Sequence, residues 1–247
     1  MTEFWNQRTK RYGHTGWSDQ AIYFYDQKIR LNTIASVLDE LDISGTALDY
    51  GCGIGDFSNL LGQKFEKVIA TDSSDEVLKR ARKKYTKPNI SFVDFPKFCL
   101  NTELGLILEI TVFQHILNDE DLVALLREFH KNLKPASYML VLDSFSDNDR
   151  VNNYTHLRKS AHFIKTVEDV GFQTVSVRNF YHPDYVPTPE FNRYRNKFIT
   201  KIANRLTHYK VLMAKSFLKY WAGIHARDHK GLIEESSPTQ LIIFRKK

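Results

Sequence analysis

The feature that most constrains the fold is a short apolar run that ends in an acid and passes directly into a glycine-rich turn. Residues 46–61 read Thr-Ala-Leu-Asp-Tyr-Gly-Cys-Gly-Ile-Gly-Asp-Phe-Ser-Asn-Leu-Leu, with glycines at alternating positions before an apolar helical pattern. This order predicts a strand, a tight loop and a helix, with which α/β proteins bring backbone N–H groups up to a nucleotide-like ligand. Glycine suits such a loop because it tolerates unusual backbone angles and lets a ligand lie against bare backbone.

The spacing of the acid and the glycines distinguishes between ligand classes. The pattern is Asp49-x-Gly51-x-Gly53-x-Gly55, whereas dinucleotide sites use Gly-x-Gly-x-x-Gly, whose third glycine allows close helix–strand packing. Asp56 occupies that third position, and its charge at the start of a helix opposes a pyrophosphate. An acid at the strand end, here Asp49, suits a ligand that carries a cationic ammonium and sulfonium.

Apolar strand patterns and amphipathic helix patterns alternate along the rest of the chain. Strands are expected at 46–50, 67–71, 90–93, 104–108, 138–142, 172–180 and 240–244, and helices at about 56–64, 75–85, 119–133 and 155–170. A further helix is expected from Ser18 or Asp19 to about Asp39, and Lys134-Pro135 is expected to stop the helix at 119–133. Such alternation predicts an α/β fold with a doubly wound, mostly parallel sheet.

Acidic residues stand at the carboxyl ends of five of these strands, where ligands of doubly wound sheets bind. They are Asp49, Asp72, Asp94, Glu109 and Asp143. Asp72 lies about twenty residues after the first glycine, where a carboxylate can accept both ribose hydroxyls of an adenosine. Ser73 beside it either adds a contact or caps the next helix, for which Ser74 is the other candidate cap. The periodic placement of these acids is a stronger signal than any one of them.

These residues together resemble class I S-adenosylmethionine-dependent methyltransferases. Residues 46–61 carry the likeness most specifically, and weaker matches follow in the family's order at Ser91-Phe-Val-Asp-Phe95 and Leu106-Ile-Leu-Glu-Ile-Thr-Val-Phe-Gln-His-Ile116. The resemblance covers roughly residues 40–180 and the last strand. It implies a Rossmann-like sheet of seven strands with an antiparallel final strand, and S-adenosyl-L-methionine as the cofactor.

The resemblance also implies roles for individual residues. Asp94 would accept the adenine amino group, Phe95 would lie on the adenine face, and Glu109 with Ile110 would lie near the amino-acid moiety and the methyl group. The family often has an aspartate early in the fourth strand, where this chain has Gly105, which leaves the ammonium contact to Glu109 or to backbone carbonyls. The expected cofactor-binding residues are Asp49, Gly51, Cys52, Gly53, Gly55, Asp72, Ser73, Asp94, Phe95, Glu109 and Ile110.

Methyl transfer from a sulfonium is an in-line displacement, in which the protein aligns the acceptor and, where needed, removes its proton. Histidine is the first candidate for such a base. His115 follows the fourth strand, and His14 lies in an aromatic, glycine-rich N-terminal segment suited to close over the site. Asp143 is a third candidate. The paired acids of a magnesium-dependent methyltransferase are not in place, so no metal is expected.

Acceptor recognition is expected from two segments outside the common core. The first is an N-terminal helical cap at 1–42, with Trp5, Arg11, Tyr12 and Trp17 as candidate substrate residues. The second is an insertion at 181–238, predicted to be helical over 190–221, with a basic stripe that either faces solvent or receives an anionic acceptor. We therefore expect a single methyltransferase domain over 1–247, with its core at 43–180 and its last strand and basic tail at 239–247.

Composition narrows the remaining choices. No apolar run reaches the roughly 18 residues of a membrane span, the N-terminus lacks a signal-peptide core, and two cysteines make no disulfide framework. We therefore expect a cytoplasmic protein. A net charge of +6 and a pI of about 9.1 permit nucleic acid, an anionic membrane surface or a phosphorylated substrate, but do not choose among them.

We expect methyl transfer to an O or N atom of a small-molecule or glycan-like acceptor, with an anionic or phosphorylated group compatible with the basic charge. An RNA or tRNA methyltransferase is the alternative, against which stands the lack of an RNA-binding module and of an Asn-Pro-Pro-Tyr-type motif. A non-catalytic cofactor-binding module is opposed by the intact glycines and strand-end acids, and an NAD enzyme by Asp56. The sequence leaves the oligomeric state open.

Overall fold

The structure, a computed structural model, describes residues 2–16, 20–94, 102–180 and 239–247. The chain divides into two compact units. The first comprises Met1–Thr15, Leu38–Arg178 and Pro238–Lys247, and the second comprises Gly16–Val37 and Asn179–Ser237. The domain boundaries expected at 42, 180 and 238 stay predictions.

A seven-stranded sheet forms the centre of the first unit. Its strands are β1 (Thr46–Tyr50), β2 (Lys67–Asp72), β3 (Ile90–Asp94), β4 (Leu104–Ile110), β5 (Leu133–Ser144), β8 (Phe172–Asn179) and β9 (Thr239–Lys246). They lie in the order β3-β2-β1-β4-β5-β9-β8. Neighbours from β3 to β5 are parallel, and β9 runs antiparallel to β5. This confirms the predicted doubly wound, mostly parallel Rossmann-like sheet of seven strands.

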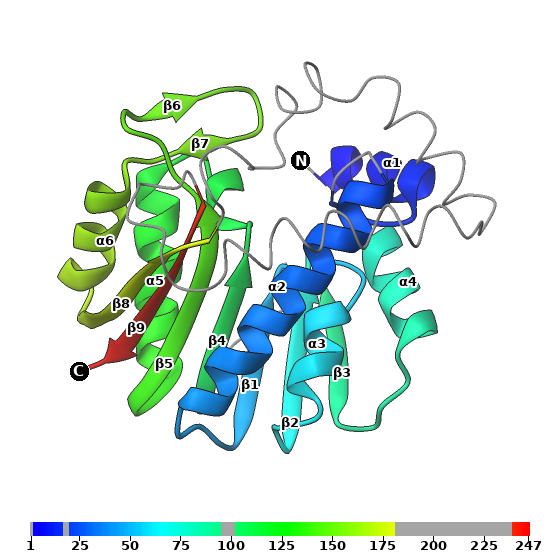
Figure 1. The fold of residues 1–247 in the computed structure, drawn as a ribbon, viewed down its shortest axis with the longest axis horizontal. Coiled ribbons are helices and arrows are strands. Elements are labelled where there is room, and N and C mark those ends of the chain that lie inside the picture. The colour runs from blue at the N-terminus through cyan, green and yellow to red at the C-terminus, as the bar shows by residue number, and fades with distance from the viewer. Residues whose placement is uncertain (1, 17–19, 95–101, 181–238) are drawn as a thin grey trace. The chain divides into compact units, whose positions relative to one another are not determined.

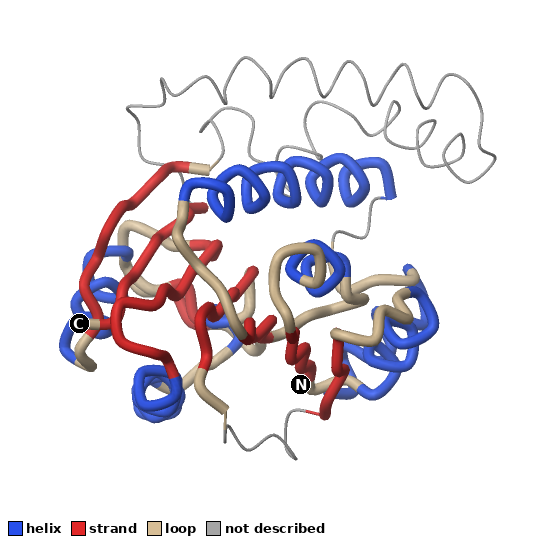
Figure 2. The backbone as a smooth tube through the Cα atoms, turned by 90° about the horizontal axis from the view of Figure 1, so that it is seen from below, coloured by secondary structure: helices blue, strands red, loops and turns tan. Residues whose placement is uncertain are grey.

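Helices lie on both faces of this sheet (Figure 2). They are α3 (Asp56–Leu61), α4 (Asp75–Lys84), α5 (Asp119–Asn132) and α6 (Ser160–Asp169). Helix α1 (Thr2–Tyr12), a 3₁₀ turn η2 (Phe113–His115) and a hairpin of β6 (Arg150–Val151) and β7 (His156–Leu157) complete the described part of this unit. Because β1 lies between β2 and β4, the strand order reverses there, which is where such folds bind ligands. The arrowhead of β4 points toward the end of the sheet that carries α1 and the hairpin (Figure 1).

The core between the sheet and helices α5 and α6 is aromatic. Phe113 packs against Phe129 of α5 and Phe163 of α6, with ring centroids 6.3 and 5.9 Å apart. Phe163 in turn contacts Phe244 of β9. All four rings are almost fully buried, so η2, which contains Phe113, is anchored in the core of the fold.

Polar side chains cap the starts of two helices. Ser74 is the N-cap of α4, because its hydroxyl accepts from the Val77 N–H at 3.3 Å, and Asn118 caps α5 through the Glu120 N–H at 2.7 Å. Ser73, the other expected cap, is exposed. Gly171 follows α6 with φ of 119°, the backbone conformation expected after a helix end.

Two predicted boundaries were wrong. The helix expected from about Thr155 begins at Ser160, because Asn152 Oδ1 accepts from the backbone N–H groups of Tyr154 and Thr155, at 2.9 and 2.8 Å, and turns the chain into the hairpin. The strand expected at 138–142 begins earlier, because β5 starts at Leu133, directly after α5 ends at Asn132, within one residue of the expected helix end.

The described part of the second unit consists mainly of α2 (Gln20–Glu40), whose extent confirms the helix expected to about Asp39. Within it, Arg30 and Asp26 form an ion pair of 2.9 Å one turn apart. The candidate caps Ser18 and Asp19, and the helix expected at 190–221, lie outside the described residues. Within the described residues, every helix is too short or too polar to traverse a lipid bilayer.

Gly105 departs from the acid that the resemblance led us to expect, and the packing of β4 explains why. A Cβ atom at this position would overlap the backbone carbonyl oxygen of Ser44. Since a backbone atom cannot move aside as a flexible side chain can, β4 accepts only glycine here.

We predict that Gly105→Ala destabilises the protein by about 3 kcal/mol or more, the upper range for overpacking a rigid site. Gly62→Ala is the control, because Gly62 has an ordinary φ of −64° and its nearest neighbour is the end of a flexible Ile90 side chain, at 2.9 Å. Urea denaturation of both variants measures the difference. Equal stability losses would show that β4 can shift away from Ser44.

Candidate functional site

The glycine loop between β1 and α3 is held in a left-handed backbone conformation. The φ angles are 73° at Gly51, 53° at Gly53 and 86° at Gly55. The Gly51 and Cys52 N–H groups both donate to the Thr71 carbonyl, at 2.8 and 2.9 Å. The loop is therefore tied to the end of β2, and a side chain at Gly51 would overlap Val112.

The loop amides also bear on which ligand the loop can hold. Besides the two that donate to Thr71, the Gly53 N–H donates to Asp72 and the Gly55 N–H to the Cys52 carbonyl. A pyrophosphate would compete with these internal bonds for its donors. Asp56, expected to repel pyrophosphate, has its carboxylate bound by Lys84 Nζ and the Tyr85 hydroxyl, at 2.5 and 2.6 Å. The loop's internal bonds are thus the better argument against a dinucleotide.

Asp72 lies beside the loop at the carboxyl end of β2. Its two oxygens accept from the Gly53 and Ser74 N–H groups, at 3.1 and 3.0 Å. Each carboxylate oxygen has a second lone pair, so the group can still accept the two hydroxyls of a ribose. Burial raises the pKa of Asp72 to about 6, against the opposing effect of these backbone hydrogen bonds.

Asp49 lies at the end of β1, beneath the loop, and is only 2% exposed. The Ser58 hydroxyl donates to its carboxylate at 2.5 Å. Burial raises the pKa of Asp49 to about 7, the Ser58 hydrogen bond opposes this rise, and the neighbouring carboxylates of Asp72 and Asp56 add to it. A cation bound nearby would favour the ionised carboxylate. The adjacent Cys52 is buried, and burial raises the pKa of its thiol.

The end of β3 brings another expected residue close to Asp72. Asp94 is paired with Asp72 in the register of the two strands, and its carboxylate lies 3.7 Å from the Arg82 guanidinium. Phe95 lies outside the described residues, so its expected place on an adenine face stays a prediction.

The acids at the ends of β4 and β5 hold the turn that follows β4. Glu109 is fully buried and accepts from the Val112 N–H and, at 3.1 Å, from the Phe113 N–H. Asp143 accepts from the Gln114 N–H at 2.9 Å. Beyond Ile110, Thr111 has a φ of 56°, an unusual angle for a non-glycine residue. The two carboxylates fix η2, and with it the position of His115.

His115 has a defined orientation and tautomer. Its Nδ1 lies 2.8 Å from the Tyr154 carbonyl oxygen. Because a carbonyl only accepts, Nδ1 carries the proton and Nε2 carries the lone pair. Burial lowers the pKa of His115, with the bond to Tyr154 opposing the shift, so the imidazole is neutral at pH 7. This is the arrangement that a general base requires.

Helix α1 connects the two sides of this site. The Ser74 hydroxyl donates to Asn6 Oδ1 at 2.6 Å, which fixes α1 against the start of α4. On the other side, the Trp5 ring meets the His115 ring edge-on, with centroids 4.9 Å apart, and Phe4 stacks on Tyr154 at 5.6 Å. The N-terminal cap expected from its aromatic residues therefore reaches the turn that carries His115.

The segment after α1 lies over the glycine loop. A Cβ atom at Gly53 would lie 3.3 Å from the Thr15 hydroxyl. His14 is only 3% exposed. Burial lowers its pKa to about 4, and Arg8 and Lys84 lower it further while Asp56 opposes them. A group of that pKa is a weak proton acceptor at neutral pH.

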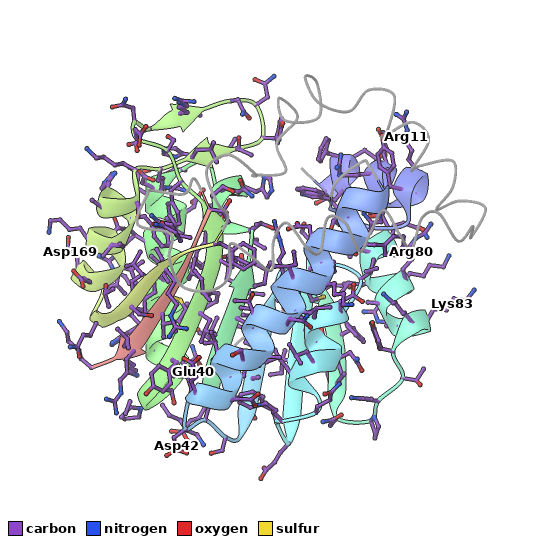
Figure 3. The ribbon with its side chains drawn as sticks, in the orientation of Figure 1. Arg11, Glu40, Asp42, Arg80, Lys83 and Asp169 are labelled. Carbon is purple, nitrogen blue, oxygen red and sulfur yellow. The ribbon has the colours of Figure 1, made fainter. Side chains whose placement is uncertain are left out.

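The expected substrate residues fall in different places. Trp5 reaches His115, and Tyr12 stacks loosely on His14 with centroids 6.5 Å apart. Arg11 is exposed and extends outward from α1 (Figure 3), so its placement gives no support to a substrate contact. Trp17 lies outside the described residues.

Sequence reasoning missed Arg158, which follows β7 and is only 4% exposed. Its guanidinium donates to the Phe113 and Ile116 carbonyls, at 3.2 and 2.8 Å, and to Asp119 at 2.7 Å. His156, also in β7, contacts the Leu117 carbonyl at 3.1 Å. Hydrogen bonds from the hairpin and the residue after it therefore fix the turn that carries His115. A buried arginine that joins segments so far apart leaves no local pattern to detect.

Comparisons with known proteins agree with this geometry. Residues 47–136 match a family model described as methyltransferase domain. No curated protein matches the chain in sequence. Solved structures with the same fold include a DhpI complex with S-adenosylhomocysteine, at 15% identity and a TM-score of 0.58, covering 73% of this chain and 89% of the other.

Two further structures extend the likeness. The N-methyltransferase NodS from Bradyrhizobium japonicum, solved with S-adenosyl-l-homocysteine, shares 12% identity at a TM-score of 0.57, covering 90% of this chain and 87% of the other. A putative methyltransferase in complex with the Haloferax volcanii Trm112 methyltransferase activator shares 14% identity at a TM-score of 0.60, covering 99% and 95%. At these identities the likeness establishes the fold.

We predict that Arg158→Met destabilises the protein by about 2–4 kcal/mol, because it leaves the Phe113 and Ile116 carbonyls without their donors at a site where the arginine is buried, at about 1–3 kcal/mol for each unsatisfied group. Arg178→Met is the matched control: Arg178 pairs with Glu40 at 3.0 Å, but both side chains are about half exposed, so its loss should cost at most about 1 kcal/mol. Chemical denaturation compares the two. Equal small losses would mean that the hairpin does not depend on Arg158.

Proposed function

We propose that this protein, whose residues 47–136 match a family model described as methyltransferase domain, methylates an oxygen or nitrogen atom of a small acceptor, with His115 as the base. The observation that carries this proposal is the His115 imidazole. It is neutral, it is oriented through Nδ1 by the Tyr154 carbonyl, and it lies at the strand ends where the fold binds ligands.

The chain's own residues fit the donor. When bound, S-adenosylmethionine supplies a methyl group activated by a sulfonium. The left-handed glycine loop provides bare backbone for its close approach, and Asp72 provides lone pairs for ribose hydroxyls. Asp49 provides a buried negative charge that a cationic ligand would stabilise. Asp94 is the group we assign to the adenine amino group.

His115 is the stronger of the two histidine candidates. Its Nε2 carries the lone pair that would take up the proton lost by the acceptor's oxygen or nitrogen. His14, with a pKa near 4, is a poor base at pH 7. Asp143 already accepts from the Gln114 N–H, and its role in this proposal is to hold the turn that positions His115.

A small acceptor follows from the place of α1. The helix reaches from Ser74 at the end of β2 to His115 beyond the end of β4, and so lies over the strand ends between the two. Because α1 covers the strand ends, a small acceptor enclosed next to His115 fits the site better than a long polymer does. Trp5, which contacts the His115 ring, would lie against the acceptor.

We predict that His115→Gln lowers kcat by about 10²- to 10⁴-fold, the usual range for loss of a general base. In the wild type, kcat should rise with pH through the lowered His115 pKa, below 6.5, and then level off, since only the neutral imidazole accepts a proton. Turnover is measured with an acceptor found by incubating the enzyme and methyl-labelled donor with metabolite extracts.

The control for this experiment is His162→Gln, because His162 is half exposed on α6, and its replacement should leave kcat within about twofold. Full turnover of His115→Gln, with an unchanged pH profile, would show that His115 is not a general base. Alignment of the acceptor with the methyl donor would then account for the rate by itself.

We also predict that donor-site binding releases protons near neutral pH. The pKa values of Asp49 and Asp72, about 7 and about 6 in the free protein, fall when a cationic ammonium and ribose hydroxyls stabilise the carboxylates. Calorimetry with S-adenosylhomocysteine in buffers of different ionisation enthalpy should show release at pH 6.5 and almost none at pH 8.5, where both groups are already ionised. Asp49→Asn should reduce the release, and a buffer-independent enthalpy at pH 6.5 would contradict the assignment of both acids.

A further inference from the structure

Helix α1 presents a cation on the face that packs against the protein. Its least exposed residues include Trp5, Arg8, Thr9 and Tyr12, at the spacing of one helical face. Thr9 is fully buried and Trp5 meets His115, so this face is turned toward the site. An arginine in such a position calls for an explanation, because inner helix faces are normally apolar.

The guanidinium of Arg8 has a defined place among three segments. Its Nε donates to the Thr15 carbonyl at 2.9 Å, and its Cζ lies 5.3 Å from the centre of the Tyr12 ring. Tyr154 of the β6–β7 hairpin is near enough to interact with it electrostatically, and partial burial lowers its pKa. Arg8 is thus a positioned cation that has lost part of its water, which increases what it gains from an anion.

Arg8 also lies between the two halves of the proposed site. Thr15, whose carbonyl holds its Nε, has its hydroxyl against the loop at Gly53. Trp5, one helical turn earlier, contacts the His115 ring. One turn of helix is about 5 Å along the axis, so an acceptor at His115 need be no larger than a small metabolite to reach Arg8.

The geometry points to Arg8 as the receptor for an anionic group of the acceptor, a carboxylate or a phosphate, flanked by the rings of Tyr12 and Tyr154. The planar guanidinium can pair with either anion through two parallel hydrogen bonds. This inference rests on the proposed function and narrows it. The acceptor is a small acid that carries its methylated oxygen or nitrogen within about 10 Å of the acidic group, which is the 4.9 Å between the His115 and Trp5 rings plus about one helical turn from Trp5 to Arg8.

The test uses phenyl phosphate and benzoate as probes, titrated by ligand-observed NMR against protein saturated with S-adenosylhomocysteine. Arg8→Gln should weaken both probes by tenfold or more, the effect of losing charge-assisted hydrogen bonds. Arg11→Gln is the matched control. Arg11 is a cation on the same helix, 5.1 Å from the same Tyr12 ring, but it is exposed, so both probes should stay within twofold of the wild type.

Three outcomes overturn the inference: no binding of either probe to the wild type, unchanged binding to Arg8→Gln, or an equal loss in Arg11→Gln, which would indicate general charge attraction. If Arg8→Gln does not fold by circular dichroism, Arg8→Lys decides. It keeps the charge but lacks the planar fork, and should weaken both probes at least threefold. Unchanged probe binding to Arg8→Lys then overturns the inference.

A second experiment decides whether Arg8 binds an anionic group of the acceptor or the carboxylate of the donor. S-adenosylhomocysteine carries that carboxylate and 5′-methylthioadenosine lacks it. If Arg8→Gln weakens the first and not the second, Arg8 serves the donor and the acceptor inference is wrong. If the wild type binds neither, the proposed function fails, and titration of the probes against ligand-free protein still tests Arg8 by itself.

Discussion

The carboxylate of Asp72 is the interaction on which the rest of the site depends. It joins the glycine loop after β1, through the Gly53 N–H, to the start of α4, through the Ser74 N–H. The Ser74 hydroxyl then binds Asn6, which fixes α1. Because α1 is fixed there, Trp5 can contact His115 on the other side of the strand ends. A residue expected only to bind ribose thus also sets the geometry of the cover over the site.

The five acids at the strand ends form two groups, one around the glycine loop and one that hydrogen-bonds to the turn after β4. Asp49, Asp72 and Asp94 stand at the ends of β1, β2 and β3, around the loop that we assign to the donor. Glu109 and Asp143 instead accept from backbone N–H groups of the turn after β4. The Arg158 guanidinium donates to carbonyl groups of the same turn. Both the N–H groups and the carbonyl groups of the turn are therefore hydrogen-bonded to charged side chains. The turn is therefore rigid enough to present one histidine in one tautomer.

Those parts of the fold and site that depend on neighbouring residues could be predicted from the sequence. The glycine loop, the cap at Ser74 and the strand-end acids each follow from a few adjacent positions, and their periodic recurrence gave the parallel sheet. The antiparallel β9 came only from the family resemblance. The β6–β7 hairpin was missed because the Asn152 side chain competes with a helical pattern. Arg158 was missed because its partners lie far away in the sequence, and Arg8 because its place beside Tyr154 of the hairpin depends on the tertiary fold.

The electrostatics of the loop suggest why the chain accepts two acids with raised pKa values. A carboxyl group whose pKa is higher in the folded than in the unfolded state adds stability at low pH, and this contribution fades as the pH rises through the folded value. For Asp49 and Asp72 the loss extends from about pH 4 to about pH 7. The ligand-free protein therefore reaches neutral pH with these acids destabilising it. A ligand that carries a positive charge and ribose hydroxyls stabilises the ionised carboxylates and so removes this destabilisation. The site therefore favours a cationic adenosine compound over a neutral or anionic one.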